Sequence, residues 1–495
     1  MLPRRLLARI IRELGNSGSL NSSEESWKTY QQAKKEIPMT TQSSKQSALF
    51  PKGVLKKPVA VRFDDEGQSS DGGAMLLSQL DSGIGLTRSL AKHLLDERDQ
   101  ERVLHQYELL FKQRVFGIAL GYSDCNDFDR LRSDPCLKMA CGQDPLAPET
   151  DLGSQPTLSR FENSQSARAL ITMQRELEDF VIKRLSRRKR KAKLVTIDLD
   201  PTVDPVHGQQ IFSFFHGHYD TSCFLPLMGF LTIDDDPEQY LFCARLRPGN
   251  AGCCRNAIPL LRRVVPELRK RFPRAKIRVR LDGGFANPMM LNVLEELKVQ
   301  YLVAMGGNNV LKGLAEPMMK TVRRQSEESG VSEKTYGDAE YKAASWSRSR
   351  RVVIKAECVQ HPGRQMRDNV RYVITNLRYG PQKTYEAYCG RGDSENRIKE
   401  MKDLDMDRTS CSRFLANQLR LTISATAYVL LQELRWRLRH TEAARSQVGR
   451  LRLMLLKIGT RVVESCRRIV LHFPRSHPWP VLWLRAARAT GASLP

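Results

Sequence analysis

The chain is 495 residues long and carries 80 Lys and Arg against 55 Asp and Glu, so its net charge is +25 and its isoelectric point lies near 9.8. A charge this far from zero favours a polyanionic partner, with nucleic acid ahead of a membrane surface. The longest apolar runs, around Leu421 to Leu431, are shorter than the roughly 20 residues of a membrane-spanning helix, which excludes an integral membrane protein.

The eleven cysteines include no Cys-x-x-Cys pair and only one vicinal pair, Cys253 and Cys254. Zinc knuckles and disulfide frameworks need tighter spacing. We therefore expect reduced thiols in a soluble, cytoplasmic protein.

The first segment, residues 1–50, is rich in Ser, Asn, Gln, Thr and Lys and lacks the apolar periodicity that burial requires. This composition predicts a disordered arm. Met39 opens a second polar run and is a candidate translational start, so that part of the arm would lie upstream of the true start. The basic beginning of the chain has an apolar run interrupted by arginine and is not interpreted as a signal peptide.

Residues 51–190 are predicted to form a helical DNA-binding region, because apolar residues recur at helical spacing from Met75 to Phe180. Within it, Gln155–Glu162 places Ser, Thr and Arg near a helix start, where they either bind phosphate or simply cap the helix. The basic run Lys183–Lys193 is either a solvated linker or a salt-sensitive DNA contact.

Strand-like segments begin at Leu194, where the apolar period changes from helical to alternating. Residues 191–310 then hold strand-like runs followed by a helix, a strand, a helix and a strand. This pattern fits an RNase H-like fold, whose order is three strands, helix, strand, helix, strand. We interpret them as the first part of a catalytic core. The expected strands are Leu194–Asp200, Ile211–Phe215, Cys223–Ile233, Tyr240–Leu246, Lys276–Asp282 and Tyr301–Ala304, with helices over Asn256–Lys270 and up to Lys298.

The alternation with helices stops at residues 311–384, where further strand-like runs appear at Arg351–Glu357 and Val370–Ile374. This pattern predicts a β-rich insertion. The predicted fold class is therefore α/β, an RNase H-like mixed sheet with a β-rich insertion, flanked by helical N- and C-terminal regions.

The rest of the chain is expected to contain the end of the core, followed by a separate C-terminal region. Residues 385–435 are predicted to hold a catalytic helix and the end of the core, and residues 436–495 a basic C-terminal region. Long apolar-periodic helices are predicted over Leu415–Leu438 and Val448–Ile469.

Three carboxylates stand at positions suited to metal-dependent phosphoryl transfer. Asp200 and Asp282 each end an apolar strand, and Glu395 opens a helix after the insertion. Carboxylate oxygens are ligands of Mg²⁺, and two such ions can clamp the attacking and leaving oxygens of an in-line displacement. We predict that Asp200, Asp282 and Glu395 are catalytic and bind two Mg²⁺ ions, with Mn²⁺ also compatible.

Each aspartate also has a simpler interpretation, because an acid after a strand is most often a turn former. Asp198 points to the same face of its strand as Asp200, and Asp204 follows closely, so both compete for the role. Asp200 is preferred over Asp198 because it stands at the end of the strand, where a metal ion has access.

Around Glu395, the residues Tyr388, Arg391 and Lys402 stand at offsets that one continuous helix would place on one face. Two intervening glycines argue against a helix that runs back to Tyr388. We expect Asp393 to cap the helix, with Tyr388 and Arg391 on the preceding loop. The alternative is an ordinary solvated helix with charge pairs four residues apart.

Together these residues resemble the DDE transposases of bacterial insertion sequences. Asp200-Pro-Thr, Asp282 after Arg-Val-Arg-Leu, and the Tyr-x2-Arg-x3-Glu-x6-Lys spacing are similar to the signature of the cut-and-paste branch that carries a β-rich insertion. The resemblance runs from about Phe50 to the C-terminus. Motifs that resemble the insertion-sequence thirteen-eighty family within that branch are Gln155–Phe161, Asp204–Gln210 and Arg247–Asn250.

The resemblance implies a recombinase that binds double-stranded DNA at terminal inverted repeats, cuts the strand at the element's end and joins the freed 3′-hydroxyl to target DNA. It also implies a homodimer in the DNA complex. Phosphate contacts are expected from Tyr388, Arg391, Lys399 and Lys402.

In related enzymes the insertion supplies an aromatic ring that stacks on a flipped base. Trp346 is the candidate here, although a lone Trp in a β-rich block is more often a core residue. Two other functions fit the same residues: an RNase H-like DNA nuclease without strand transfer, and a domesticated DNA-binding protein without catalysis.

Overall fold

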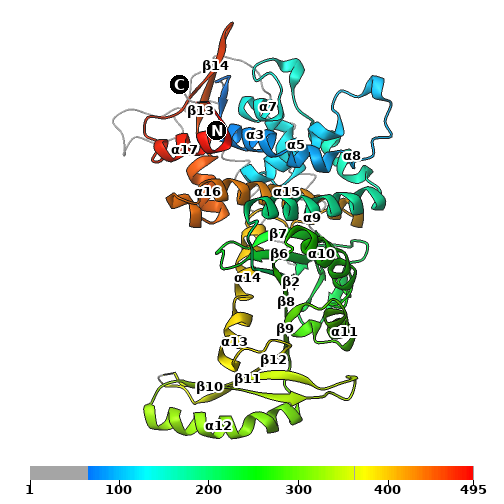
Figure 1. Cartoon of the computed structure of the whole chain (residues 1–495). Helices are drawn as coiled ribbons and strands as arrows, with labels where there is room; N and C mark the ends of the chain where they lie inside the picture. Colours follow the sequence, from blue (N-terminus) through cyan, green and yellow to red (C-terminus); the bar gives the residue numbers. More distant parts are fainter. Residues whose placement is uncertain (1–64, 362, 494–495) are drawn as a thin grey trace, which may run out of the picture. The chain divides into compact units, whose positions relative to one another are not determined.

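The computed structural model describes residues 65–361 and 363–493 (Figure 1). The predicted disordered arm, residues 1–50, and the candidate start at Met39 lie outside the described residues. Within the described part of the chain, no helix is both long enough and apolar enough to cross a membrane. All eleven cysteines fall in the described ranges and are free thiols.

Helices dominate the first part of the described chain, which confirms the helical spacing from Met75 to Phe180. Three of them end at glycines in the left-handed conformation, Gly85, Gly121 and Gly142, where a side chain would be strained. The elements are α3 (Ala74–Ile84), α4 (Leu86–Ala91), η1 (Gln100–Arg102), α5 (Tyr107–Leu120), η2 (Cys125–Asp127), α6 (Phe128–Leu131), α7 (Pro135–Cys141), η3 (Pro148–Thr150), α8 (Gln155–Ser164) and α9 (Ala167–Arg188).

A buried ion pair joins two of these helices. Arg114 of α5 donates from Nε to Oε1 of Glu162 on α8 at 2.7 Å, and the two side chains are 0% and 2% exposed. Arg114 also donates to the carbonyl of Ser123 at 2.8 Å. Because neither charge reaches water, each needs the other as its partner.

The basic run Lys183–Lys193 begins inside α9 and does not form a linker there. Arg184 donates to Glu433 at 3.0 Å, and Arg188 pairs with the same carboxylate. The guanidinium of Arg188 also lies over the ring of Trp436, 3.7 Å from its centroid. The arginines in the first half of the run therefore pack α9 against a later helix.

The predicted core forms a mixed sheet. Strand β2 (Leu194–Pro201) lies at its centre, antiparallel to β6 (Leu227–Ile233) and parallel to β8 (Lys276–Leu281). The five strands run in the order β7, β6, β2, β8, β9, with β7 at Tyr240–Arg245 and β9 at Gln300–Met305. The parallel connections are made by the helices, as crossovers of this kind require. They are α10 (Ala257–Arg271), η4 (Gly283–Phe285) and α11 (Pro288–Glu296).

A second, three-stranded sheet leaves the end of β2. It consists of β3 (Asp204–Pro205), β5 (Thr221–Phe224) and β4 (Phe214–His216) in that order. The predicted strand Cys223–Ile233 is thus two strands. Pro226 separates them, and proline cannot donate a hydrogen bond to a sheet.

The predicted β-rich insertion contains three long strands, but it opens with a helix that the prediction missed. α12 (Asn309–Ser329) buries five residues at helical spacing, Leu311, Ala315, Met319, Val322 and Ser326. Pro317 inside the helix and a largely polar sequence weaken its apolar signal.

The strands of the insertion continue the core sheet. β12 (Arg367–Thr375) pairs antiparallel with β9, β11 (Arg350–Val359) pairs with β12, and β10 (Glu333–Tyr341) forms the far edge. The sheet therefore has eight strands, in the order β10, β11, β12, β9, β8, β2, β6, β7 (Figure 1). The helix α12 packs on β10 and β11.

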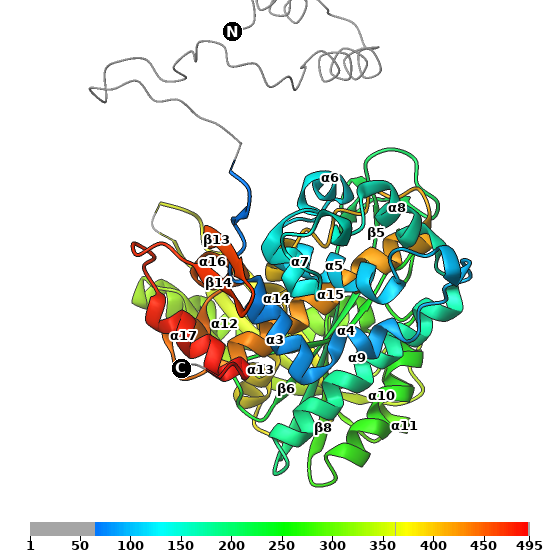
Figure 2. The same ribbon diagram turned by 90° about the horizontal axis from the view of Figure 1, so that it is seen from above.

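The predicted long helix over Leu415–Leu438 is confirmed as α15 (Phe414–Arg437), which is buried along almost its whole length. It packs against α5, α8, α9 and β7, while α9 also lies beside α10 (Figure 2). Because β7 is an edge strand, its outward N–H groups need partners. Gln432 accepts from the N–H of Leu241 at 3.0 Å, and Gln418 accepts from that of Leu246 at 2.7 Å.

The second predicted helix, Val448–Ile469, is wrong beyond its first two turns. α16 ends at Leu455, and a hairpin follows whose first strand pairs with β1 near the start of the described chain. That pairing is far apart in sequence, so local periodicity does not reveal it. The remaining elements are β1 (Gln68–Ser69), α13 (Pro381–Cys389), α14 (Gly392–Lys402), η5 (Glu442–Arg445), α16 (Val448–Leu455), β13 (Thr460–Ser465), β14 (Arg468–His472) and α17 (Pro480–Thr490).

The buried pair between α5 and α8 gives a stability prediction. Arg114→Met should lower the free energy of unfolding by about 3–5 kcal/mol, because it leaves the Glu162 carboxylate buried without its partner. Denaturant unfolding measures this change. The matched control is Arg88→Met, which breaks an exposed pair with Glu108 and should cost about 0.5 kcal/mol or less. Equal effects of the two substitutions would contradict the prediction.

Candidate active site

Two of the predicted acids lie at the carboxyl ends of neighbouring parallel strands. Leu199 of β2 pairs in register with Leu281 of β8, so Asp200 and Asp282 follow at the same edge of the sheet. Arg391 joins them: its Nη2 lies 2.9 Å from Asp200 Oδ1 and 3.8 Å from Asp282 Oδ2. Asp282 also accepts from the N–H of Gly284 at 2.9 Å, which fixes its orientation.

The third predicted acid reaches the same guanidinium from α14. Arg391 Nη1 lies 3.3 Å from Glu395 Oε1, and the Glu395 side chain is 59% exposed. The hydroxyl of Ser394, which sequence reasoning missed, lies 2.8 Å from the carbonyl oxygen of Arg391 and 3.3 Å from Asp200 Oδ2, so it can donate to either. Asp200, Asp282 and Glu395 therefore converge on one cation, although they come from three distant parts of the chain.

Two details of the predicted helix differ from the expectation. Tyr388 lies in the helix α13, not on a loop, and Asp393 lies inside α14, whose first residue is Gly392 and whose cap position is Arg391. The chain bends between the two helices at Gly390, where Arg280 passes so closely that a Cβ atom would collide with it. The helix is interrupted as expected, but the break covers only Gly390 and Arg391, and Gly392 already belongs to α14.

The competing acids are engaged elsewhere. Asp198 is fully buried and accepts from Nε and Nη2 of Arg280, both at 2.7 Å. Asp204 is fully buried and accepts from the hydroxyl of Thr409 at 3.0 Å. This leaves Asp200 as the acid at the end of β2 that faces Arg391.

Burial governs the charge of Asp200. It raises the pKa of this carboxyl to about 6, Arg391 opposes the rise, and the neighbouring Asp282 and Glu395 add to it. A nearby cation stabilises the charged form of such a buried carboxyl. In the described structure that cation is Arg391, whose Nε is buried without a hydrogen-bond partner.

The predicted phosphate-binding residues lie around this site but differ in their contacts. Tyr388 packs beside Tyr385 with ring centroids 6.2 Å apart, and burial raises its pKa, with Asp282 and Asp200 adding to the rise. Lys402 donates to the carbonyl of Val203 at 3.2 Å. Lys399 is exposed on α14.

Trp346 does not present its ring to a base in this structure. It is 4% exposed, lies edge-on to Tyr341 with centroids 5.4 Å apart, and has the guanidinium of Arg350 above its face at 5.1 Å. These surroundings agree with the core interpretation of this lone tryptophan, and the stacking role implied by the resemblance stays a prediction.

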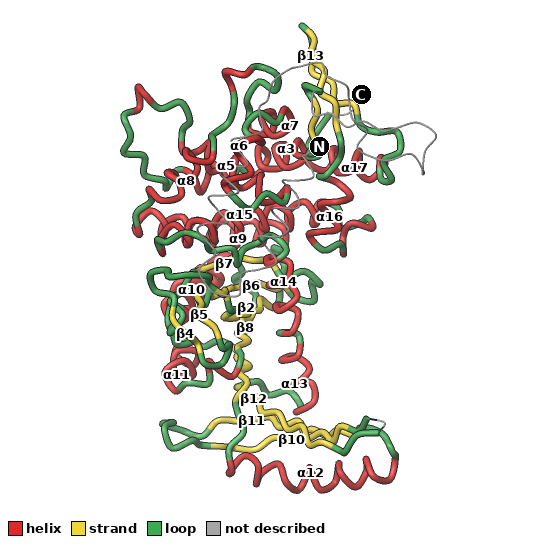
Figure 3. Tube along the Cα trace, turned by 180° about the vertical axis from the view of Figure 1, so that it is seen from behind, coloured by secondary structure: helices red, strands yellow, loops and turns green. Residues whose placement is uncertain are grey.

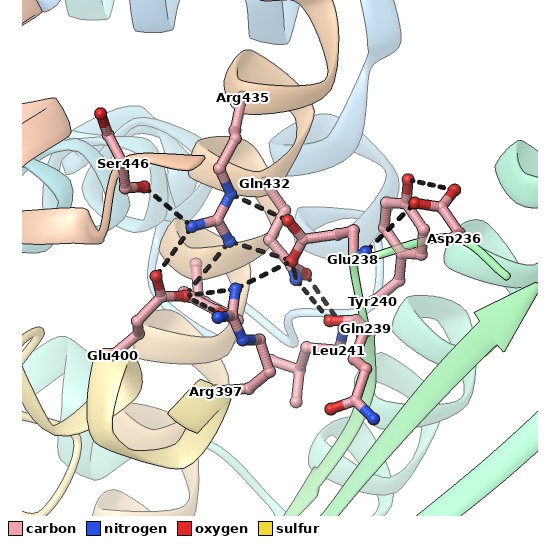
Figure 4. A network of polar contacts seen from close by, with 11 residues as sticks. Asp236, Glu238, Gln239, Tyr240, Leu241, Arg397, Glu400, Gln432, Arg435 and Ser446 are labelled. Carbon is pink, nitrogen blue, oxygen red and sulfur yellow. Dashed lines mark hydrogen bonds and ion pairs between the residues drawn. The ribbon is translucent and has the colours of Figure 1, made fainter. Parts of the chain in front are cut away.

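A buried charge network holds the acid-bearing helix in place (Figure 4). Glu400 of α14 accepts from Arg435 of α15 at 2.8 Å and from Tyr428 at 2.5 Å. Arg435 also donates to Glu238, before β7, at 2.9 Å. Arg397 of α14 lies 3.2 Å from Glu400. The network ties α14 to both α15 and the sheet.

A divalent metal ion such as Mg²⁺ needs several oxygen ligands close together. In residues 65–361 and 363–493, no three His, Cys, Asp or Glu side chains are grouped closely enough to hold a metal ion as they stand. The oxygens of Asp200, Asp282 and Glu395 surround Arg391 instead. Carboxylate oxygens are the ligands of Mg²⁺, so the donor chemistry fits such an ion where it replaces the guanidinium between them.

Comparison with known proteins identifies the family. The family model described as Transposase DDE domain group 1 matches residues 52–490. No curated protein gives a significant match to the chain.

The charge network gives a second stability prediction. Glu400→Gln should lower the free energy of unfolding by about 3–5 kcal/mol, because it removes the negative charge between Arg397 and Arg435 in a buried site. Thermal and denaturant unfolding measure the loss. Glu464→Gln on the exposed face of β13 is the control and should change stability by about 0.5 kcal/mol or less. A Glu400→Gln protein as stable as the control would show that the network contributes nothing.

The buried Asp204 gives a pH prediction. Burial raises its pKa to about 8, so the folded protein keeps this proton to higher pH than the unfolded chain, whose aspartate titrates near pH 4. This group therefore makes the free energy of unfolding fall as pH rises from about 4 to about 8. Asp204→Asn removes the effect and can still accept from Thr409.

At pH 8.5 the free energy of unfolding of Asp204→Asn should exceed that of the wild type by about 3–5 kcal/mol. The difference should vanish near pH 4. Denaturant unfolding at both pH values tests this. Asp393→Asn, an exposed acid on α14, is the control and should show little pH-dependent difference. A wild type more stable than Asp204→Asn at pH 8.5 would contradict the sign.

Proposed function

The chain belongs to the DDE transposase family, group 1, and from this premise we propose that it is an insertion-sequence transposase that binds terminal inverted repeats and catalyses metal-dependent cleavage and transfer of the DNA strand. The observation that carries the proposal is the convergence of Asp200, Asp282 and Glu395 on Arg391. The family acts on DNA by phosphoryl transfer, and three convergent acids are the donors that such chemistry needs.

The finer affiliation that we propose is the insertion-sequence thirteen-eighty family in the cut-and-paste branch. It is supported by the Tyr388, Arg391, Glu395 and Lys402 spacing and by the motifs around Asp204. An RNase H-like core is proposed from the strand order β7, β6, β2, β8, β9, with β2, β8 and β9 parallel. We further propose a homodimer in the DNA complex.

We propose that Asp200, Asp282 and Glu395 hold two Mg²⁺ ions, with Mn²⁺ as an alternative. When bound, such ions activate the attacking oxygen and stabilise the leaving 3′-oxygen. Asp200 contributes a carboxylate that the strand β2 holds rigidly at the sheet edge, and the Ser394 hydroxyl can orient it by donating a hydrogen bond. The side chain of Glu395 is exposed, so of the three acids it is the one that can most easily change its conformation to reach a metal ion.

Arg391 has two roles in this proposal. Without metal and DNA, its guanidinium offsets part of the negative charge of the three acids and weakens their mutual repulsion. With DNA present, it turns to a phosphate near the scissile bond, for which its planar, two-pronged geometry is suited. Tyr388, Lys399 and Lys402 are proposed to contact neighbouring phosphates, with Lys402 leaving the carbonyl of Val203 to do so.

The test uses end-labelled duplexes that carry the DNA flanking the coding sequence, together with a supercoiled target plasmid. Asp200→Asn, Asp282→Asn and Glu395→Gln should each reduce strand cleavage by about a hundredfold or more while leaving binding to the labelled end nearly unchanged. Lys312→Gln on α12 serves as a surface control that should cleave normally. A single acid variant that cuts and joins at the wild-type rate would remove that residue from the site.

The same assay separates the proposal from its rivals. A transposase yields labelled ends joined to the plasmid, a nuclease yields cut ends without joined product, and a non-catalytic DNA-binding protein yields neither.

A further inference from the structure

An exposed aromatic hairpin stands out on a chain whose surface charge is strongly basic. In the run Phe214 to Tyr219, five of the six residues carry rings, and the sixth is Gly217. Phe215 is 65% exposed, Phe214 is 40% exposed and Tyr219 is 37% exposed. We call the segment from Phe214 to Phe224, which contains β4 and β5, the aromatic hairpin (Figure 3).

Three rings near the turn of the hairpin, those of His216, His218 and Tyr219, contact one another. Those of His216 and Tyr219 have centroids 5.0 Å apart, and those of His218 and Tyr219 have centroids 4.8 Å apart. The hairpin contains no Lys or Arg and only one carboxylate, Asp220. Such a surface has little attraction for phosphates, but its ring faces match the faces of nucleobases.

Backbone contacts place this hairpin beside the acids. β3 begins at Asp204, shortly after Asp200, and its Pro205 pairs with Cys223 of β5. On the other side, Phe224 bridges to Pro248. Phe214, at the other end of the hairpin, pairs with Cys223 in turn, so both ends lie close to the edge of the sheet at which β2 ends.

The loop that follows Pro248 completes the connection to Asp282. Gly249 donates to the carbonyl of Phe212 at 3.2 Å, and only glycine fits there, because a Cβ atom would collide with the carbonyl of Cys223. Further along the loop, Cys253 packs directly against Gly284, whose N–H binds Asp282. In agreement, the pKa of Tyr219 is raised by burial and also by the carboxylates of Asp282 and Asp200.

From this juxtaposition we propose that the aromatic hairpin is a binding surface for unpaired nucleotides next to the scissile phosphate, with Phe215 as its main stacking face. The inference rests on the proposed action on DNA. Bases in an intact duplex have their faces covered, so the rings can stack only where base pairs at the DNA end are open. By stacking on unpaired bases, the hairpin would stabilise a DNA end whose base pairs are open next to Asp200 and Asp282.

Because the DNA ends are not known, the test uses a duplex with an unpaired tail that carries 2-aminopurine at the junction, and a blunt duplex of the same sequence. The wild type should bind the tailed duplex more tightly and change the 2-aminopurine fluorescence on stacking. Phe215→Ala should weaken binding of the tailed duplex about tenfold with little change for the blunt one. Phe215→Trp should restore the preference.

Met289→Ala, a substitution of an equally exposed apolar residue on α11, is the control and should behave as the wild type. Unchanged preference for the tail in Phe215→Ala would overturn the inference, as would a wild type that shows no such preference. A change of Phe215→Ala from dimer to monomer in sedimentation, with the tail preference intact, would also overturn it and assign the rings to a subunit contact.

Failure of the proposed function has a different signature. In that case the wild type would not cleave end-labelled duplexes, whatever the result with the tailed DNA. Conversely, a wild type that cleaves and joins DNA while Phe215→Ala binds both duplexes normally would refute only the role of the hairpin.

Discussion

The contact between Glu400 and Arg435 is the constraint on which the site depends. Both side chains are buried, and a buried charge requires a partner, so the helix α14 has one favourable orientation against α15. That orientation turns Glu400 inward and leaves Glu395, more than one turn earlier, on the open side. Glu395 on the helix thus lies near Asp200 and Asp282 on the sheet because of the Glu400–Arg435 pair, whose two charges do not face these acids.

Arg391 counters the repulsion between the three carboxylates of the site. Three carboxylates at one sheet edge repel each other, and the burial of Asp200 increases the cost of its negative charge. A guanidinium among them relieves this repulsion within the chain itself. The chain itself therefore offsets part of the negative charge of the site. In the reaction that we propose, the same side chain would turn to a phosphate when a metal cation replaced it.

Much of the core was predictable because its signals are local. The apolar run before Asp200 and the strand before Asp282 are both buried strands, and their order along the chain predicts two acids at one sheet edge. Other features depend on distant contacts. The pairing of Thr460 with Ser69 turns an expected helix into a hairpin, and the burial of Trp346 under Arg350 follows from packing that no spacing reveals.

In the site, too, local patterns predict some features and contacts between distant residues determine the others. Asp200, Asp282, Glu395 and Arg391 were identified from spacing and residue type, and the structure brings them together. Ser394 gave no signal, since a serine in the first turn of a helix is common. The engagement of Asp198 by Arg280 was equally hidden, because alternation along a strand gives the face of a residue and not its partner.

The continuity of the eight-stranded sheet has a mechanical consequence. The insertion is hydrogen-bonded to β9 through β12, and β9 lies next to β8, the strand that ends at Asp282. Each strand from β10 to β8 is hydrogen-bonded to its neighbour, so a displacement of the insertion reaches β8 through β12 and β9. A DNA segment that pulls on the insertion would thus act as a lever on the spacing between Asp282 and Asp200.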